Sequence, residues 1–215
     1  CRRFWAKFRA AEIDEAGIEK IESRLVTTSG TCAVMGTAST MACITETLGM
    51  ALPGTAAIPA IHADRLRAAE ASGAQAAYLA QIDRDKQLIP KKIITPASVE
   101  NALRILLAVG GSTNAIIHLT AIAGRLGIPI PLQQLNKLSD ETPVLIDLKP
   151  TGDHYMEDLF KAGGLGVVLR ELKPLLTLEA LSVTGETPTE RLKSEPANVN
   201  REVVRSFDQP IQKMG

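Results

Sequence analysis

Apolar positions recur at helical spacing along most of the chain, and polar stretches rich in glycine separate the segments in which they recur. After Ser29, a run of small and hydroxyl-bearing residues precedes apolar residues spaced by three and four positions. This pattern predicts a loop that enters a helix near Gly36 or Thr37. Thr95-Pro96 pairs a favoured cap with a favoured first-turn residue, and the run 99–109 is apolar on most faces, which predicts a buried helix.

Three further helices are predicted by the same criteria. Residues 8–24 are rich in charge and predict an exposed helix. A helix over 63–72 should be closed by Gly73. The sequence Gly110-Gly-Ser-Thr-Asn114 breaks the chain and should start another buried helix, which ends at Gly127.

The segment 143–148 has the pattern of a strand. A turn at 150–152 follows, then a helix over 155–162 that stops at Gly163-Gly164, and a further helix over 165–172. Because helices outnumber strands and the two alternate, we predict an α/β fold with layered helices around a small, largely parallel sheet.

Composition excludes several classes of protein. The chain has 215 residues, of which 45% are hydrophobic, and 24 basic side chains balance 24 acidic ones. A neutral chain lacks the basic excess typical of nucleic-acid binding. Neither a run of ~20 apolar residues nor a secretory leader is visible, so we expect a cytoplasmic protein that does not enter a membrane. The chain opens at Cys1 without an initiator Met, which we interpret as a segment of a longer polypeptide.

Three cysteines, Cys1, Cys32 and Cys43, are too few and too widely spaced for a disulfide framework or a self-contained zinc site. Cys32 lies between glycines and hydroxyls just before a predicted helix N-terminus, where free N–H groups stabilise a thiolate that can bind metal. The alternative is that Cys32 packs in the core, as free cysteines commonly do. Cys43 falls on an apolar helical stripe and is expected to be a packing residue.

The turn at Gly110 is a second candidate site. Its glycines allow close approach of the backbone, and Ser112, Thr113 and Asn114 could hold an anion together with helix N–H groups. The alternative is a glycine turn in which Ser112 or Thr113 caps the helix. If the turn forms part of a site, residues 112–114 should be mostly buried and within side-chain reach of the loop from Gly30 to Gly36. His118 lies on the same helical face as Asn114, but a lone histidine of this kind is commonly a core residue.

Adjacent carboxylates at Glu157 and Asp158 could act in acid–base chemistry or bind magnesium. Acidic residues in a first helical turn also interact favourably with the helix dipole, which is the plainer explanation. Arg65 and Arg67 could recognise a carboxylate or could lie on a surface helix.

Several motifs in one order resemble the dihydroxy-acid and sugar-acid dehydratase family. The matching stretches together span most of the chain between Ser29 and Leu176, and they are Ser29-Gly-Thr-Cys-Ala-Val-Met-Gly-Thr-Ala-Ser-Thr-Met-Ala42, Leu52-Pro-Gly-Thr55, Gly110-Gly-Ser-Thr-Asn-Ala115 with His118, Met156-Glu-Asp158 and Ala162-Gly-Gly164.

The resemblance implies a [2Fe-2S] cluster held by three cysteine thiolates, with Cys32 as one of the three, and a bound Mg²⁺. The other two cysteines, the magnesium ligands and the serine that acts as base belong to parts of the family that this chain does not contain. Neither Cys1 nor the pair Glu157 and Asp158 matches those positions. We therefore expect the chain to be inactive alone.

By the same resemblance, residues 1–194 would be part of an N-terminal cluster-binding domain of a larger two-domain enzyme, and 195–215 would lead to a second domain. The complete enzyme would be a homodimer or homotetramer that acts on a small dihydroxy acid. The stretches Cys1-Arg-Arg-Phe-Trp5, 118–129 and Thr184-Gly185 favour a sugar acid, such as a pentonate, over a precursor of branched-chain amino acids. A non-catalytic domain for subunit contacts or anion binding is the alternative from another class.

Overall fold

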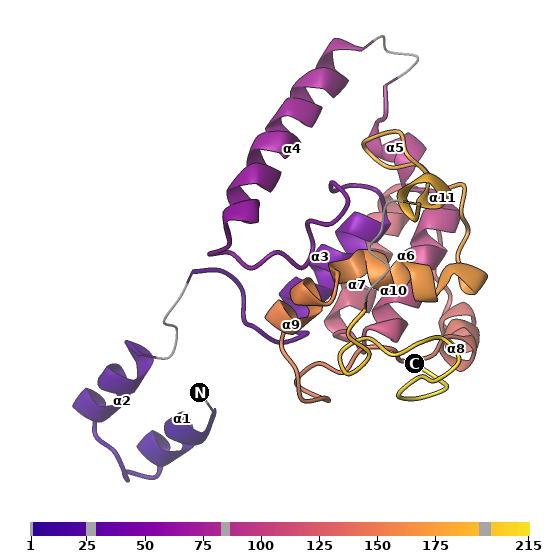
Figure 1. Cartoon of the computed structure of the whole chain (residues 1–215). Coiled ribbons are helices and arrows are strands. Elements are labelled where there is room, and N and C mark those ends of the chain that lie inside the picture. Colours follow the sequence, from indigo (N-terminus) through magenta and orange to yellow (C-terminus); the bar gives the residue numbers. More distant parts are fainter. Residues whose placement is uncertain (1, 25–28, 83–86, 194–198) are drawn as a thin grey trace. The chain divides into compact units, whose positions relative to one another are not determined.

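A computed structural model of the chain describes residues 2–24, 29–82, 87–193 and 199–215 (Figure 1). Its contacts divide the chain into two units, Cys1–Gly30 and Thr31–Gly215. Cys1 and the predicted domain boundary at residues 194 and 195 lie outside the described residues.

The first unit contains two helices, α1 (Arg2–Arg9) and α2 (Glu15–Glu22), where the charge pattern predicted one. The division is explained by Asp14, whose carboxylate accepts a hydrogen bond of 2.8 Å from the backbone N–H of Gly17 and so caps a new helix. Ala11, in the connection, has a positive φ of 55°, which a helix cannot contain. Ile18 is the buried residue of α2, so the expected exposed character is otherwise confirmed.

The second unit is built from helices around α6 (Figure 1). Their bounds are α3 Thr37–Thr47, α4 Ala63–Gln81, α5 Pro90–Ile93, α6 Pro96–Ala108, α7 Asn114–Arg125, α8 Leu132–Glu141, α9 Met156–Lys161, α10 Gly164–Glu171, the 3-10 helix η1 Lys173–Leu175, and α11 Pro188–Arg191. Helix α6 contacts α3, α7, α8 and α10, which places it at the centre of this unit.

Most predicted helix starts are confirmed. Helix α3 begins at Thr37, after Gly36. At the start of α6 the Thr95 hydroxyl accepts from the backbone N–H of Ser98, and the Ser98 hydroxyl accepts from the N–H of Thr95, at 3.3 and 2.8 Å. This reciprocal pair satisfies two N–H groups that the helix cannot bond internally, so the sequence alone fixes the boundary.

The prediction that Gly73 ends a helix is wrong, because α4 continues to Gln81. The residues after Gly73 include Ala74, Ala76 and Ala77, and alanine has the highest helix propensity. One glycine costs only ~1 kcal/mol in a helix interior, and the alanines that follow offset this cost.

The predicted parallel sheet is not found among the described residues. The segment 143–148 is extended, but it forms only isolated bridges: Val144 pairs with Gln212 and Ile146 with Val204, both antiparallel, and Leu148 pairs with His154 in parallel. The strand pattern arose because consecutive residues of the segment, such as Leu145 and Ile146, are both buried and apolar, whereas the partners of the segment come from irregular chain. The fold of the described residues is therefore helical, and the α/β prediction is corrected in this respect.

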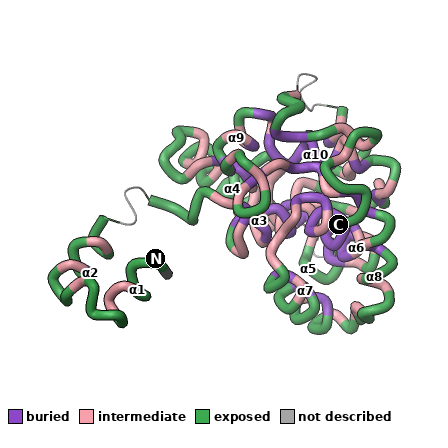
Figure 2. The backbone as a smooth tube through the Cα atoms, turned by 90° about the horizontal axis from the view of Figure 1, so that it is seen from below, coloured by how far each residue is buried: buried purple, intermediate pink, exposed green. Residues whose placement is uncertain are grey.

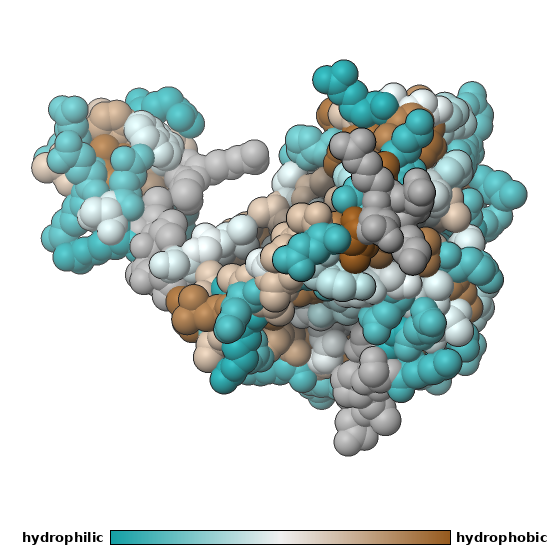
Figure 3. All heavy atoms as spheres, turned by 90° about the horizontal axis from the view of Figure 1, so that it is seen from above, coloured by the Kyte–Doolittle hydropathy of each residue, from teal (hydrophilic) through white to brown (hydrophobic). Residues whose placement is uncertain are grey.

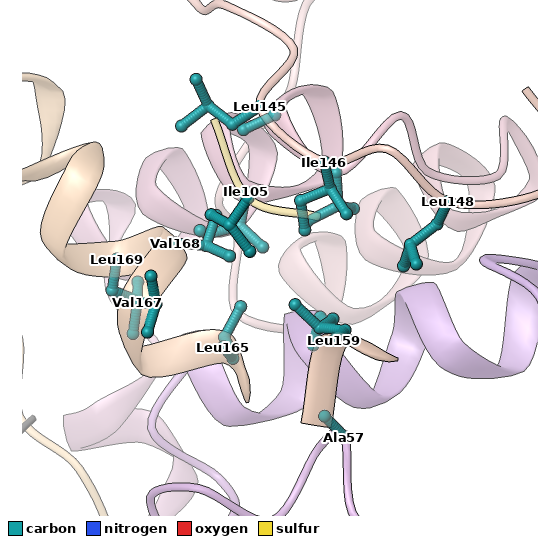
Figure 4. Packing of buried hydrophobic residues seen from close by; sticks show 14 of the residues in the cluster. Ala57, Ile105, Leu145, Ile146, Leu148, Leu159, Leu165, Val167, Val168 and Leu169 are labelled. Carbon is teal, nitrogen blue, oxygen red and sulfur yellow. The ribbon is translucent and has the colours of Figure 1, made fainter. Parts of the chain in front are cut away.

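Buried residues gather in two clusters, shown in purple in Figure 2. One lies between α6, α9, α10 and the segment 143–148, where the labelled side chains of Figure 4 point toward one another. The other lies between α3, α6, α7 and α8. The prediction that 99–109 forms a buried helix is confirmed, and because α6 contributes to both clusters, it joins the two halves of the core.

The surface of this unit also carries large apolar side chains, visible as brown atoms among hydrophilic ones in Figure 3. Ile61, Leu66, Ile117 and Leu132 are each at least 70% exposed. Among the helices that the structure describes, none has the length and apolar character needed to cross a membrane.

Candidate functional site

Two backbone hydrogen bonds join the loop that carries Cys32, just after the cysteine, to one distant segment. The N–H of Met35 donates to the carbonyl of Lys149, and the N–H of Met156 donates to the carbonyl of Ala33, both at 2.8 Å. The Met35 side chain is 3% exposed and anchors the loop in the core. The segment 149–156, which leads into α9, therefore holds the part of the loop that leads into α3.

Cys32 lies at the N-terminal end of α3 and is exposed. Its Sγ atom is 3.4 Å from the position that a Cβ on Gly36 would occupy, so the sulfur lies beside the residue that precedes the helix. Gly36 has no side chain to cap α3. An accessible sulfur next to free N–H groups suits a thiolate ligand, since those groups favour negative charge. Cys32 is exposed, so the alternative that it packs in the core is wrong.

Cys43 is a packing residue, as predicted. It is fully buried in α3 and belongs to the larger apolar cluster. Burial, with a further contribution from the Glu46 carboxylate, raises the pKa of the Cys43 thiol to about 12. A thiol that stays protonated at neutral pH is a poor metal ligand, so the two cysteines differ in chemistry as well as position. Cys1 lies outside the described residues.

A cluster of hydroxyl groups joins the N-terminus of α3 to the turn before α7. The Thr37 and Ser112 hydroxyl oxygens are 2.8 Å apart, and the Asn114 amide donates to the Thr37 oxygen at 3.2 Å. The backbone N–H of Ser112 donates to the Thr40 hydroxyl at 3.0 Å, while that hydroxyl donates to the carbonyl of Gly36. Three separate polar contacts therefore hold the turn against α3.

Gly111 makes this contact possible. A Cβ at this position would lie 2.7 Å from the Thr40 methyl group and 3.0 Å from the carbonyl oxygen of Leu106. Gly110 has a positive φ of 57°, which other residues rarely adopt. The two glycines thus allow the chain to turn while its backbone touches α3.

The structure brings the turn within hydrogen-bonding reach of Thr37 and Thr40 in the first turn of α3, which directly follows the loop from Gly30 to Gly36. The prediction that the turn is mostly buried is wrong: Ser112 is half-buried, and Thr113 and Asn114 are exposed. The polar partners come from α3, so the turn needs no burial to satisfy them. Thr113 precedes α7 but makes no side-chain cap, whereas the Ser112 hydroxyl accepts from the N–H of Asn114 at 3.3 Å.

Sequence reasoning missed Thr37 and Thr40, which complete the cluster. Both lie in the first turn of α3, three residues apart, and so on one helical face, which was the available signal. Nothing local indicated that this face meets residues 72 and 75 positions further along the chain.

The contacts of the remaining candidate residues Glu157, Asp158 and His118 do not point to a catalytic or metal site. Glu157 pairs with Lys161 at 2.8 Å, and Asp158 accepts from the N–H of Tyr155 at 2.8 Å, so both act at the start of α9 as the helix-terminus explanation predicted. His118 is exposed on α7, one turn beyond Asn114, and is not a core residue. Within the described residues no three His, Cys, Asp or Glu side chains are grouped as a metal site would need.

The family model and the individual relatives that match this chain point to the same protein family. The model of the family described as dihydroxy-acid/6-phosphogluconate dehydratase N-terminal matches residues 1–191. A dihydroxy-acid dehydratase of Caldanaerobacter subterraneus subsp. tengcongensis is 41% identical over 209 residues, and one of Caldicellulosiruptor bescii is 42% identical over 211. These alignments cover 96% and 97% of the chain but 37% of each relative. A third relative with this name, from Acetivibrio thermocellus, is 38% identical over 97% of the chain.

Proposed function

Because the chain belongs to the dihydroxy-acid/6-phosphogluconate dehydratase N-terminal family, we propose that it is part of a hydro-lyase. The proposed reaction removes the C2 proton and the C3 hydroxyl of a 2,3-dihydroxy acid as water. The resulting enol tautomerises to a 2-keto acid. The chain spans 37% of the length of the relatives given above, so we assign the activity to a longer polypeptide, in which this chain forms part of the N-terminal domain.

The exposed Cys32 beside the hydroxyl cluster is the observation that carries the proposal. One accessible thiol at a helix N-terminus fits a single ligand position of an iron–sulfur cluster. It does not complete one, since the described residues offer no second thiol nearby that ionises readily. We propose that Cys32 contributes one of three thiolates, and that the other two come from outside this chain. Such a cluster, with Mg²⁺, would supply Lewis acids for the leaving hydroxyl and the substrate carboxylate.

We propose that the hydroxyl cluster orients the substrate. Asn114 and Thr113 are exposed, and their polar side chains can meet substrate hydroxyl groups, while Thr37 and Ser112 hold each other in place. The contacts from α3 fix the positions of these groups before a substrate arrives, so little ordering is needed on binding. The chain's own residues thus bind and position, and proton transfer falls to groups outside it.

We propose first the class of substrate and then the preferred substrate within that class. The relatives' names support a dihydroxy acid, and they do not support the sugar-acid preference that the sequence suggested. We propose the dihydroxy acid with an alkyl end as the preferred substrate and a pentonate as the second candidate. Comparing kcat/KM for the two substrates with the complete enzyme decides between them, because buried polar groups left without partners penalise the wrong one.

Replacing the two cysteines one at a time tests the site. In the complete enzyme, Cys32→Ser should lose both the visible absorption of the cluster and the activity, whereas Cys43→Ser should keep both. Equal loss from the two variants would show that Cys32 is not the ligand. Full retention by Cys32→Ser would instead favour a non-catalytic domain for subunit contacts or anion binding.

A second experiment uses the 215-residue chain alone. Supplied with iron and sulfide, it should not form a stable cluster, because one thiolate does not replace three. Formation of one [2Fe-2S] centre per chain, measured by absorption and iron content, would contradict the ligand count. A homodimeric or homotetrameric enzyme in the cytoplasm remains a prediction.

A further inference from the structure

The position of Cys32 depends on the segment 149–156. The two backbone hydrogen bonds between this segment and residues 33–35 lie just after the cysteine. Among the described residues, no backbone hydrogen bond is made by 29–32, the stretch that ends at Cys32. The thiol is therefore held through the residues that follow it, and the segment that fixes those residues also limits where the sulfur can lie.

Hydrogen bonds from the backbone and from one side chain close the start of this segment into a turn. The N–H of Gly152 donates to the carbonyl of Leu148 at 2.8 Å. One carboxylate oxygen of Asp147 accepts from the backbone N–H of Asp153 at 2.6 Å. Asp147 therefore joins the residue before the turn 148–152 to the residue after it.

Asp147 is itself held in place, so its carboxylate is a fixed acceptor. Its backbone N–H donates to the carbonyl of Val203 at 2.9 Å. Its neighbours Ile146 and Leu148 are buried, and their side chains belong to the larger apolar cluster (Figure 4). The core thus determines where the carboxylate lies, and the carboxylate determines where the turn closes.

Gly152 leaves room for the carboxylate inside the turn. A Cβ at this position would overlap the carboxylate oxygen of Asp147 and lie 2.7 Å from the backbone nitrogen of Leu148. Packing that leaves no space for a methyl group indicates that the turn is shaped around the carboxylate. The turn also reaches the second candidate element, since the Thr151 hydroxyl oxygen is 3.9 Å from the position of a Cβ on Gly110.

The Asp147 carboxylate serves the turn as an acceptor, and its charge has no partner there. Arg201 and Arg205 line the same hollow as Asp147. Within the residues that the structure describes, neither arginine forms an ion pair with Asp147, and Arg201 pairs with Glu171 at 2.8 Å. An uncharged oxygen in the same place could therefore accept the same hydrogen bond.

We infer that Asp147 is a positioning residue for the Cys32 thiol. Its hydrogen bond to Asp153 keeps the turn closed, and the segment that contains the turn holds the backbone of 33–35. The inference rests on the proposed function in one respect, the role of Cys32 as a cluster ligand. Residues that orient a metal ligand without touching the metal commonly change metal affinity by about 10–100-fold when they are replaced.

Hydrogen exchange in the complete enzyme tests the link between Asp147 and the loop. Asp147→Ala removes the acceptor, so the amides of Met35 and Met156 should exchange at least ~10-fold faster, as expected for loss of one hydrogen bond to a charged group. Mass spectrometry of peptides that contain these amides measures the rates. Amides in α6 should keep their rates and Cys43 should stay unreactive toward an alkylating agent, which shows that the core is intact.

Two matched variants separate the acceptor from the charge. Asp147→Asn keeps an oxygen that can accept from Asp153, so its exchange should equal that of the unmodified enzyme. Asp153→Ala removes an exposed carboxylate from beside the same turn but keeps the N–H donor, and it should also leave exchange unchanged. Unchanged exchange in Asp147→Ala would overturn the inference. Exchange as fast in Asp147→Asn as in Asp147→Ala would overturn the acceptor role assigned to the carboxylate.

Cluster release shows whether this link matters to the ligand. Asp147→Ala should lose its cluster to a chelator about 10-fold faster than the unmodified enzyme, and the electron paramagnetic resonance spectrum of its reduced cluster should shift. Asp153→Ala should match the unmodified enzyme in both. Faster exchange without faster release, in an enzyme that loses its cluster on Cys32→Ser, would overturn the positioning role and leave the proposed function intact. Retention of the cluster by Cys32→Ser would instead refute the proposed function and, with it, the ligand role that Asp147 supports.

Discussion

The carboxylate of Glu46 offers a stringent test of how the second unit is held together. Glu46 lies in the last turns of α3, and its side chain is fully buried. One carboxylate oxygen accepts from the N–H of Gly54 at 2.9 Å and also from Arg191, and the other accepts from the N–H of Ala56 at 2.7 Å. One side chain thus connects α3, the loop 52–57 and α11.

Glu46→Gln removes the charge with little change in volume. The Gln oxygen can still accept at one of the two oxygen positions, but the NH₂ group then faces a donor where the other oxygen stood, and Arg191 loses the carboxylate charge. Breaking a buried pair by changing one partner costs about 3–5 kcal/mol, and the retained acceptor favours the lower end. For a chain of this size, about 3 kcal/mol corresponds to a fall in Tm of roughly 6–12 °C.

Thermal unfolding followed by circular dichroism measures this change. Glu157→Gln is the matched control, because Glu157 also pairs with a cation, Lys161, but is 63% exposed. Its Tm should not change measurably, since water and salt screen the exposed pair. Equal Tm values for Glu46→Gln and Glu157→Gln would refute the reasoning and show that the carboxylate of Glu46 contributes nothing beyond a surface pair.

Two further predictions concern the candidate site and its helix. Gly111→Ala should destabilise the protein by about 1–3 kcal/mol, because its Cβ would overlap Thr40, whereas Gly124→Ala, with nothing within 4 Å, should stabilise it by ~0.5–1 kcal/mol; urea unfolding of both variants measures this, and equal shifts would contradict the close contact. Cys43 should resist alkylation until the protein unfolds, while Cys32 should react in the folded state. Because the pKa of Cys43 is raised from 9.0 to about 12, the unfolded chain releases this proton first, so the free energy of unfolding should fall between those pH values. Cys43→Ala should lose that slope, and an unchanged pH profile would show that another group causes it.

Sequence reasoning was accurate where a boundary depends on neighbouring residues. The start of α6 at Thr95-Pro96 and the start of α3 at Thr37 follow from capping and from the change in composition beside them. It failed where the outcome depends on distant partners. The apolar run of 143–148 reflects burial of consecutive residues such as Leu145 and Ile146, and the pairing that would make it a strand required regular partner segments, which the described residues do not provide.

The sequence by itself predicted the starts of α3, α6 and α7 and the glycine turn as a candidate site, since these depend on residue types and short spacings. Local context made Cys32 only a possible ligand, and the family resemblance favoured it. Only the tertiary structure decided that Cys32 is exposed while Cys43 is buried, because both are cysteines near or within one helix and their surroundings come from other segments. It also decided that Thr37 and Thr40 meet Ser112. Contacts between groups more than 70 residues apart depend on how helices pack, and packing is set by the whole core at once.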